Sequence, residues 1–288
     1  MRAVTKPAAQ PVQEVFSLDP PPGAAARPFL KWAGGKRQLL PEILKLVPER
    51  FGTYFEPFIG GAALFFSLQP RHAVLNDFNE RLARTYRGVR SDVESVITLL
   101  RSYPHSRAFF EVFRKRSPDG GFDSDLAAWL IYLNRTAYNG LYRVNRANAF
   151  NTPFGDYANP TICDAPLLRA CSAALKSAEI RTGDFEEAVR GAKRGDFVYF
   201  DPPYVPLSEY SDFSRYTSVP FAGTDQVRLR DVALKLKRRG VHVLLSNSSA
   251  PIVHELYEKD FELIHVGATR ALNCRPGGRG KVVELLIR

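Results

Sequence analysis

Cysteine is scarce in this chain of 288 residues, and its histidines are scattered. The three cysteines, Cys163, Cys171 and Cys274, cannot build the disulfide framework of a small secreted fold, and no Cys-x-x-Cys pair is present. The five histidines show neither a His-Glu-x-x-His motif nor another paired spacing. We therefore expect neither a disulfide framework nor a metal site.

Long apolar runs are absent as well. No segment approaches the roughly 18 apolar residues that a membrane-spanning helix needs. The first residues lack the apolar stretch of a signal peptide. These absences exclude a transmembrane helix and lead us to expect a cytoplasmic protein.

Acidic residues are the minority among the charged ones. Forty Lys and Arg stand against 30 Asp and Glu, which gives a net charge of +10. A surplus of this size favours a polyanionic partner, most often nucleic acid, although basic charge also serves solubility. Hydrophobic residues at 45% are ordinary for a globular protein and exclude a wholly disordered chain, a coiled coil and a collagen-like fibre.

The chain is predicted to comprise a tail, an α/β domain and an insertion. Residues 1–27 are rich in Pro, Ala and Gln, and are predicted to be a disordered tail because they have little apolar surface to bury. Residues 28–79 and 161–288 alternate between strand and helix patterns, whereas 80–160 predict several helices followed by a polar, aromatic loop region. This arrangement predicts a doubly wound, Rossmann-like α/β domain that carries a helical insertion. The expected strands are 54–56, 72–75, 179–181, 197–200 and 241–245, with a hairpin formed by 261–266 and 282–287.

The most specific motif is Asp201-Pro202-Pro203-Tyr204, which directly follows an expected buried strand. A carboxylate at the carboxyl end of such a strand lies where α/β folds form their ligand clefts. The two prolines stiffen the backbone and leave the Pro202 carbonyl free, and Tyr204 adds a flat ring. Carboxylate, carbonyl and ring together suit a planar amine. The alternative is a strand that ends in proline and a capping aspartate.

A second pair of features is typical of nucleotide-type folds. The segment from Phe55 to Gly61 reads as a strand, a glycine turn and the start of a helix, where a ligand can approach backbone N–H groups. Asp77 ends the next strand, at the position where a carboxylate accepts hydrogen bonds from ribose hydroxyls. Packing explains the glycines equally well, and Asp77 could instead cap a helix that begins near Asn79.

A third motif is Trp32-Ala33-Gly34-Gly35-Lys36, which is expected to open a helix with apolar residues at 39, 40, 43, 44 and 47. It is not a P-loop, because Leu30 stands at the first glycine position and Arg37 replaces the required Ser or Thr. An ammonium beside a helix N-terminus suits a carboxylate.

These motifs together resemble the Dam family of DNA adenine-N6 methyltransferases, in the α-type order and over the chain from about residue 28 onward. The catalytic motif of the family, DPPY, corresponds to Asp201–Tyr204, and Val205-Pro206-Leu207-Ser208 follow it. The other matching segments are Phe29–Lys36, Phe55–Gly61, Asn76-Asp77, Leu133-Asn134-Arg135, Tyr138–Arg143 and Phe150–Gly155. The chain departs from the family pattern at Gly60-Gly61-Ala62 and at Ala147-Asn148-Ala149.

The resemblance implies a class I fold that binds S-adenosylmethionine, with residues 28–79 and 161–288 as the catalytic domain. Lys36 is expected at the carboxylate of the cofactor, Asp77 at its ribose, and Asp184-Phe185 on its adenine side. Asp184 could equally cap a helix. The expected catalytic residues are Asp201, Pro202 and Tyr204. The expected cofactor-binding residues are Trp32, Lys36, Phe55, Glu56, Pro57, Gly60, Asp77, Asp184, Phe185 and Asp201.

The resemblance also implies that the insertion at 80–160 recognises double-stranded DNA and that the target adenine is flipped out of the helix. Lys and Arg of the insertion and of the 275–281 loop are expected at phosphates. The expected DNA-binding residues are Lys31, Asn139, Leu141, Arg143, Asn145 and Pro153, with GATC or a related sequence as the site. Arg suits a guanine edge, and Leu and Pro suit a thymine methyl.

The expected protein is a monomer in the cytoplasm, associated with the DNA of a bacterium or phage. A cognate restriction endonuclease is a further partner that the resemblance allows, as is a role in DNA replication or mismatch repair. Two alternatives stay open: a DNA-binding protein without activity, and a methyltransferase for cytosine N4, RNA or a protein amide. Asp201 favours adenine, because related enzymes for the other acceptors often have Ser or Asn there.

Overall fold

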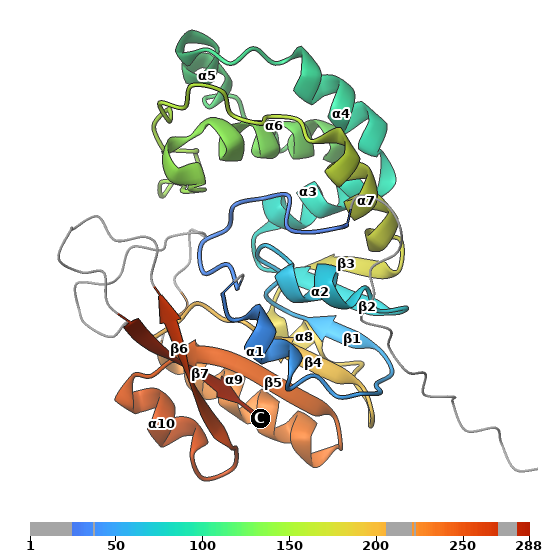
Figure 1. Ribbon diagram of the computed structural model, residues 1–288, viewed down its shortest axis with the longest axis vertical. Helices are drawn as coiled ribbons and strands as arrows, with labels where there is room; N and C mark the ends of the chain where they lie inside the picture. Colours follow the sequence, from blue (N-terminus) through green and yellow to red (C-terminus); the bar gives the residue numbers. More distant parts are fainter. Residues whose placement is uncertain (1–24, 37, 206–220, 222, 270–280) are drawn as a thin grey trace, which may run out of the picture.

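The computed structural model describes residues 25–36, 38–205, 221, 223–269 and 281–288 (Figure 1). Several predicted features lie outside these residues: nearly all of the tail, the segment 206–208 after the DPPY motif, and most of the basic 275–281 loop.

Seven strands form a single sheet in the order β3-β2-β1-β4-β5-β7-β6. The first five strands are parallel, and β7 runs antiparallel to both β5 and β6. This mostly parallel sheet confirms the predicted α/β class and is consistent with the class I methyltransferase fold. The strands are β1 Tyr54–Glu56, β2 Ala73–Asp77, β3 Ala178–Thr182, β4 Phe197–Phe200, β5 His242–Ser248, β6 Leu263–Thr269 and β7 Lys281–Ile287.

The strand order places a topological switch point between β1 and β4. From β1 the chain proceeds to β2 and β3 on one side, and from β4 it proceeds to β5 on the other. In open parallel sheets the crevice at the carboxyl ends of the two central strands is where ligands bind. The glycine turn after β1 and Asp201 after β4 therefore share one edge of the sheet.

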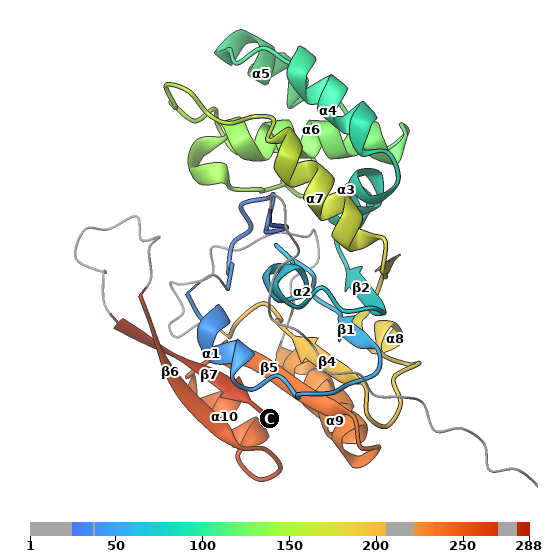
Figure 2. The same ribbon diagram turned by 45° about the vertical axis from the view of Figure 1, so that its right-hand side comes forward.

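Helices cover both faces of the sheet and extend beyond its β3 edge, where α3 to α7 gather (Figures 1 and 2). All five of these helices come from the chain between β2 and β3; α3 to α6 lie within the predicted insertion at 80–160, whereas α7 lies beyond it, in the segment assigned to the catalytic domain. The helices are α1 Leu40–Leu44, α2 Ala63–Leu68, α3 Glu80–Ser91, α4 Val93–Ser102, α5 Arg107–Phe113, α6 Asp123–Thr136, α7 Ala165–Leu175, α8 Phe185–Ala188, α9 Gly223–Arg238 and α10 Pro251–Tyr257, with a 3₁₀ turn η1 at Tyr138–Gly140.

Side chains alternate along the central strands between two hydrophobic cores. Tyr54 of β1 belongs to one core and the following Phe55 to the other, as the two-residue period of a strand requires. The first core does not stop at the sheet, because it continues through Leu82 and Tyr86 of α3 to Leu133 of α6. The helices beyond the β3 edge therefore share a core with one face of the sheet.

The helix expected to open at Gly34-Gly35-Lys36 is shorter and begins later. Helix α1 starts only at Leu40, with Pro41 in its first turn, and ends at Leu44. Gly34 has a positive φ of 75°, so the chain turns before the helix instead of entering it directly. Lys36 consequently lies in this turn, and the prediction that it sits at a helix N-terminus is wrong.

Candidate active site

Asp201 lies one residue beyond β4, at the switch point. Its Oδ1 accepts a hydrogen bond from Ser246 Oγ of β5 at 2.8 Å and forms an ion pair with Lys36 Nζ at 2.7 Å. Burial raises the pKa of this carboxyl, while the Lys36 ammonium and the Ser246 hydroxyl act in the opposite direction. Both partners therefore hold the same carboxylate oxygen, Oδ1.

Lys36 touches the catalytic motif. Its side chain is 6% exposed, and its Nζ donates a hydrogen bond to Gly34 O at 2.5 Å. The same ammonium lies over the ring of Tyr204, 4.6 Å from the ring centroid. A lysine that the resemblance assigns to the cofactor carboxylate is therefore in contact with two predicted catalytic residues.

Residues of β7 and α9 hold the remainder of the DPPY motif by hydrogen bonds. Tyr204 donates its hydroxyl proton to Glu284 Oε2 of β7 at 2.8 Å, which orients the ring. The Pro203 carbonyl accepts from Gln226 of α9 at 3.0 Å, whereas no hydrogen bond to the Pro202 carbonyl is found within the described residues. The predicted arrangement of carboxylate, free carbonyl and ring is present.

Asp77 ends β2 and faces the glycine turn after β1. Its Oδ2 accepts from the backbone N–H of Gly60 at 3.3 Å, and its Oδ1 accepts from that of Asn79 at 2.9 Å. Burial raises the pKa of Asp77 to about 6 despite these hydrogen bonds. The cap of α3 is Asn79, whose side chain accepts from the N–H of Leu82, so the alternative role of Asp77 as a helix cap is wrong.

The glycine turn is a point of close approach. Gly60 has a positive φ of 44°, and a Cβ there would lie 3.1 Å from Cδ1 of the Trp32 indole. The Gly60 carbonyl accepts from the Tyr86 hydroxyl of α3 at 2.9 Å. The turn therefore leaves a surface of backbone and indole beside Asp77, which fits a ligand that has a ribose and an apolar group.

Three further predicted residues of the turn are mainly interior. Phe55 belongs to the hydrophobic core, and the Pro57 carbonyl accepts from the side chain of Asn76 at 3.0 Å. Glu56 is 3% exposed and accepts from the Tyr54 hydroxyl at 3.0 Å, and burial raises its pKa well above the usual range. These three residues therefore support the glycine turn from the protein interior.

The Asp184-Phe185 pair opens α8, beyond β3. Asp184 caps this helix by accepting from the N–H of Glu186 at 2.9 Å, so its alternative role as a cap is confirmed. It also forms an ion pair with Arg228 of α9, whose guanidinium lies 4.5 Å from the centroid of the Phe185 ring. The ring of Phe185 stacks on Phe58, with the centroids 5.5 Å apart.

Two aromatic residues at this edge were missed by the sequence analysis. Phe58 belongs to the glycine turn and is half-buried between Phe185 and Phe221. Phe78 directly follows Asp77 and is 54% exposed. The place of Phe78 immediately after the predicted ribose ligand was the available signal.

The predicted DNA-binding residues gather on an irregular hairpin that follows α6, with Lys31 beside it. We call residues 136–155 the recognition hairpin, because Ala137 pairs with Phe154 and Val144 with Phe150. Of the predicted DNA-binding residues in the hairpin, Leu141 is half-buried. The others are exposed, namely Asn139, Arg143, Asn145 and Pro153.

The hairpin is shaped by its own backbone and by one polar side chain at its tip. The Asn145 Oδ1 accepts from the N–H groups of Ala147 and Ala149, both at 3.0 Å, and so holds the tip. Arg143 forms no ion pair among the described residues. Tyr138, which was not among the predicted residues, is 53% exposed, and its N–H donates to the Pro153 carbonyl at 2.9 Å.

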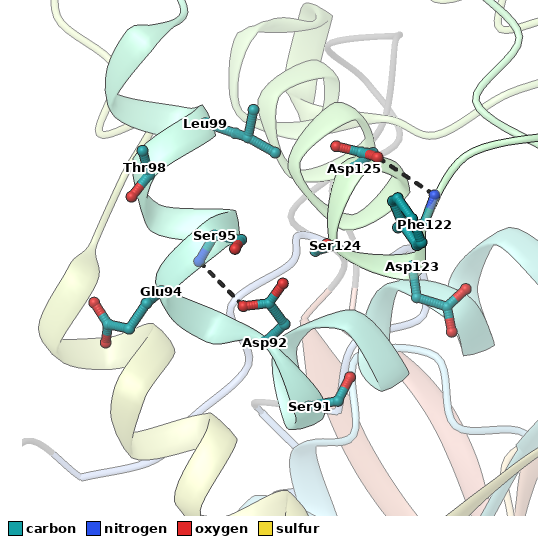
Figure 3. Close-up of a pocket in the computed structure, with 10 residues that line it drawn as sticks. All are labelled: Ser91, Asp92, Glu94, Ser95, Thr98, Leu99, Phe122, Asp123, Ser124 and Asp125. Atoms are coloured by element: carbon teal, nitrogen blue, oxygen red, sulfur yellow. Dashed lines mark hydrogen bonds between the residues drawn. The ribbon is translucent and has the colours of Figure 1, made fainter.

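A cavity of about 710 Å³ lies elsewhere, where α4 and α6 begin (Figure 3). Its acidic residues already have partners. Asp92 caps α4 through Ser95, and Asp125 accepts from the Phe122 N–H. Asp123 pairs with Arg84 and Arg87, and Glu94 pairs with Arg169. The cavity contains none of the predicted site residues.

Two searches of the described residues gave negative results. No group of three or more His, Cys, Asp or Glu side chains is arranged to hold a metal ion there. No helix in that part of the chain is long and apolar enough to cross a membrane.

Comparison with known proteins identifies similar chains along most of this sequence. A family model described as D12 class N6 adenine-specific DNA methyltransferase matches residues 32–272. The Type II methyltransferase M1.LlaDCHI of Lactococcus lactis subsp. cremoris is 48% identical over 269 residues, which cover 91% of this chain and 94% of that protein. The Type II methyltransferase M.MjaIII of Methanocaldococcus jannaschii is 38% identical, covering 91% and 98%. The DNA adenine methylase of Escherichia coli K12 is 32% identical, covering 90% and 94%.

Proposed function

Because the chain belongs to the D12 class of N6 adenine-specific DNA methyltransferases, we propose that it methylates an adenine flipped out of double-stranded DNA, with S-adenosylmethionine as methyl donor. The proposed sequence context is GATC or a related site. The observation that supports this proposal most strongly is the geometry at Asp201, where Ser246 and Lys36 hold the carboxylate at Oδ1 and the Lys36 ammonium also lies over the Tyr204 ring.

The residues at the switch point fit the cofactor. S-adenosylmethionine, when bound, supplies a methyl group activated by its positively charged sulfur. Asp77 offers a buried carboxylate for the ribose, the Trp32 and Gly60 surface offers close backbone approach, and Phe78 offers an exposed ring. Asp184 and Phe185 are proposed on the adenine side, and Phe55, Glu56 and Pro57 support the turn.

Lys36 is proposed to contact both the cofactor carboxylate and the catalytic motif. Asp201 Oδ1 at 2.7 Å and Gly34 O at 2.5 Å occupy two of the three N–H donors of its ammonium, which leaves one for the cofactor. Its contacts with Asp201 and Tyr204 favour a further role on the catalytic motif, where its positive charge lowers the pKa of Asp201 against the larger, raising effect of burial. Lys36 remains in the proposed site as the cation beside this carboxylate.

The target amine is proposed to bind between Asp201 and Pro202. The two N6 hydrogens would donate to Asp201 Oδ2 and to the Pro202 carbonyl, with the adenine ring against Tyr204. These contacts point the nitrogen lone pair at the methyl group and stabilise the positive charge that develops on N6 in the transition state. Extruding the adenine costs a few kcal/mol of lost stacking and pairing.

Recognition is assigned to the hairpin and to Lys31. Arg143 suits the acceptors of a guanine edge, and Leu141 and Pro153 suit a thymine methyl group. Asn139 and Asn145 complete the proposed set, and exposed cations of residues 80–160 are proposed at phosphates. The division into a catalytic part, 28–79 with 161–288, and a recognition insertion at 80–160 belongs to this proposal, as do the monomeric state and a cognate restriction endonuclease.

A methyl-transfer assay tests the proposal. Labelled S-adenosylmethionine is incubated with the protein and unmethylated DNA, and the modified base and its neighbours are determined. N6-methyladenine within GATC is the expected product. N6-methyladenine in another context would keep the mechanism and overturn the recognition sequence. Label on cytosine N4, or on RNA or protein alone, would contradict the proposal that adenine in DNA is the substrate.

A further inference from the structure

The side-chain amide of Asn134, in α6, joins two segments that are far apart in sequence. Its Oδ1 accepts from the backbone N–H of Lys31 at 2.8 Å, and its Nδ2 donates to the Lys31 carbonyl at 2.8 Å and to the Gly140 carbonyl at 2.7 Å. Asn134 is 0% exposed. The amide therefore pairs both backbone groups of Lys31 and ties them to the recognition hairpin.

The two joined segments lie too close for ordinary side chains between them. Gly140 is buried and has a positive φ of 66°. A Cβ on Gly140 would overlap Cδ of Lys31 and would lie 3.1 Å from the Asn134 carbonyl oxygen. Gly140 separates Asn139 from Leu141, so this contact sets the position of two proposed DNA-binding residues relative to a third, Lys31.

A ring contact crosses the same junction. Trp32, which follows Lys31 and packs on the glycine turn, stacks on Tyr142 with centroids 5.4 Å apart and an interplanar angle of 23°. Tyr142 is 2% exposed and lies between Leu141 and Arg143 in the hairpin. Phe150, on the opposite strand of the hairpin, supports Tyr142 edge-on. The cofactor-side turn and the hairpin thus meet through Trp32 and Tyr142.

We propose that Asn134 is a positioning residue for base discrimination, which acts with the Trp32–Tyr142 stack to hold the DNA-reading side chains over the catalytic edge. This inference rests on the proposed function. Asn134 contacts only backbone, so it acts by placing Lys31, Asn139 and Leu141. Loss of the amide should leave the chemistry in the active site able to proceed but weaken the preference for the correct DNA sequence.

The test compares two buried asparagines. Asn76 is 2% exposed, and its amide joins the Pro57 and Gly183 carbonyls within the cofactor side. Asn134→Ala and Asn76→Ala are assayed on the site methylated by the unaltered protein and on its single-base variants. DNA binding is measured without cofactor by fluorescence anisotropy, transfer is measured per folded molecule, and folding is followed by circular dichroism.

Asn134→Ala is expected to reduce the ratio of correct-site to altered-site binding and transfer by about tenfold or more, the size of one lost base contact. Asn76→Ala is expected to weaken cofactor binding and to keep the ratio. An unchanged ratio in Asn134→Ala, or equal losses on every DNA, would overturn the inference. Absence of methylation by the unaltered protein would instead overturn the proposed function.

The Tyr142 pair of variants decides the matter if Asn134→Ala does not fold. Tyr142→Phe keeps the ring that stacks on Trp32, whereas Tyr142→Leu removes the stack. The inference predicts wild-type discrimination in the first variant and a reduced ratio in the second. The same discrimination in both variants would contradict it.

Discussion

At the strand edge, the side chains that carry the proposed chemistry are half-buried and held by several polar partners. Asp201 is fixed by Lys36 and Ser246, and Asp77 by two backbone N–H groups. In the recognition hairpin, the side chains proposed to read DNA are exposed apart from the half-buried Leu141, and Asn134 holds the backbone beside them at Gly140. The groups proposed for catalysis therefore contact one another without DNA, whereas most of the side chains proposed to read DNA are exposed.

This contrast has a consequence for substitution. A change at the strand edge disturbs several groups that hold one another by hydrogen bonds and ion pairs, so its effect on the reaction should be large. A change of one exposed side chain in the hairpin removes a single contact and should alter preference more than rate. The following predictions are ordered by the size of the expected effect.

The largest effect is expected for Asp201→Ala. Removing the carboxylate should lower methyl transfer by about 10³-fold or more, because the developing charge on N6 loses its stabilising group. DNA binding should change by less than about threefold, since phosphate contacts supply most of it. Single-turnover transfer and anisotropy measure the two quantities.

Asp196→Ala is the matched control for this variant, since Asp196 lies at the other end of β4. It is 2% exposed and accepts from the N–H groups of Thr53 and Lys193, both at 2.8 Å. Its loss should lower stability and leave transfer per folded molecule unchanged. Near-normal transfer by Asp201→Ala would show that the catalytic assignment is wrong.

The second effect concerns Asp77 and pH. Its folded pKa of about 6 lies above the ordinary 3.8, so its contribution to stability is full below about pH 3.8 and is lost as the pH rises through 6. Cofactor binding follows the opposite sign, because the ionised carboxylate is the better acceptor for ribose hydroxyls. Calorimetric titration without DNA should show weaker binding as the pH falls below 6.

Asp77→Asn sharpens this test. The variant should bind S-adenosylmethionine about 10- to 100-fold more weakly at pH 7.5, the range expected for a lost charge-assisted hydrogen bond. Its affinity should then be nearly independent of pH between 5 and 7.5. A variant that kept the pH dependence of the unaltered protein would assign that dependence to another group.

A moderate effect is expected for Gly140→Ala, which alters the backbone of the recognition hairpin and leaves the strand edge unchanged. The added Cβ would overlap Lys31 at a position with positive φ, so we expect about 1 kcal/mol or more of destabilisation. Binding to the correct site should weaken while cofactor affinity stays the same. Gly120→Ala, where a Cβ meets nothing within 4 Å, is the matched control and should be neutral.

The smallest effect is expected for Phe122→Ala, beside the cavity where α4 and α6 begin. Phe122 is 80% exposed, so the stability should change by less than about 0.5 kcal/mol. Transfer and DNA binding should stay as in the unaltered protein. A clear loss of either activity would show that this cavity belongs to the functional surface, whereas we assign it no role in methylation or DNA binding.

The same contrast explains what could be predicted from the sequence. Parallel strands end at a common edge, so Gly60, Asp77 and Asp201 could be expected near one another from their positions after three strand patterns. The exposed hairpin residues could be grouped because they are neighbours in sequence. The α/β class followed from the alternation of strand and helix patterns, and the family resemblance specified it further.

Contacts between distant segments could not be predicted in this way. Lys36 and Asp201 are separated by 165 positions, and no periodicity in either segment indicates that they pair. The position of Lys36 depends on a turn that delays α1 to Leu40, and the spacing of apolar residues gave no sign of that delay. The hydrogen bonds from Asn134 to the backbone of Lys31 and Gly140 could not be predicted for the same reason, since a buried asparagine in a helix has no local sequence pattern.

The most direct test of the central claim, that chemistry and sequence reading are separate within the site, is to map the DNA context of N6-methyladenine made by Arg143→Ala. Arg143 is exposed and forms no ion pair within the described chain, so its loss should leave the catalytic edge intact. The account predicts N6-methyladenine in a context relaxed at one base pair, with discrimination there reduced by about 1–3 kcal/mol. Complete loss of methylation on every DNA, or methylation with the original context fully retained, would contradict it.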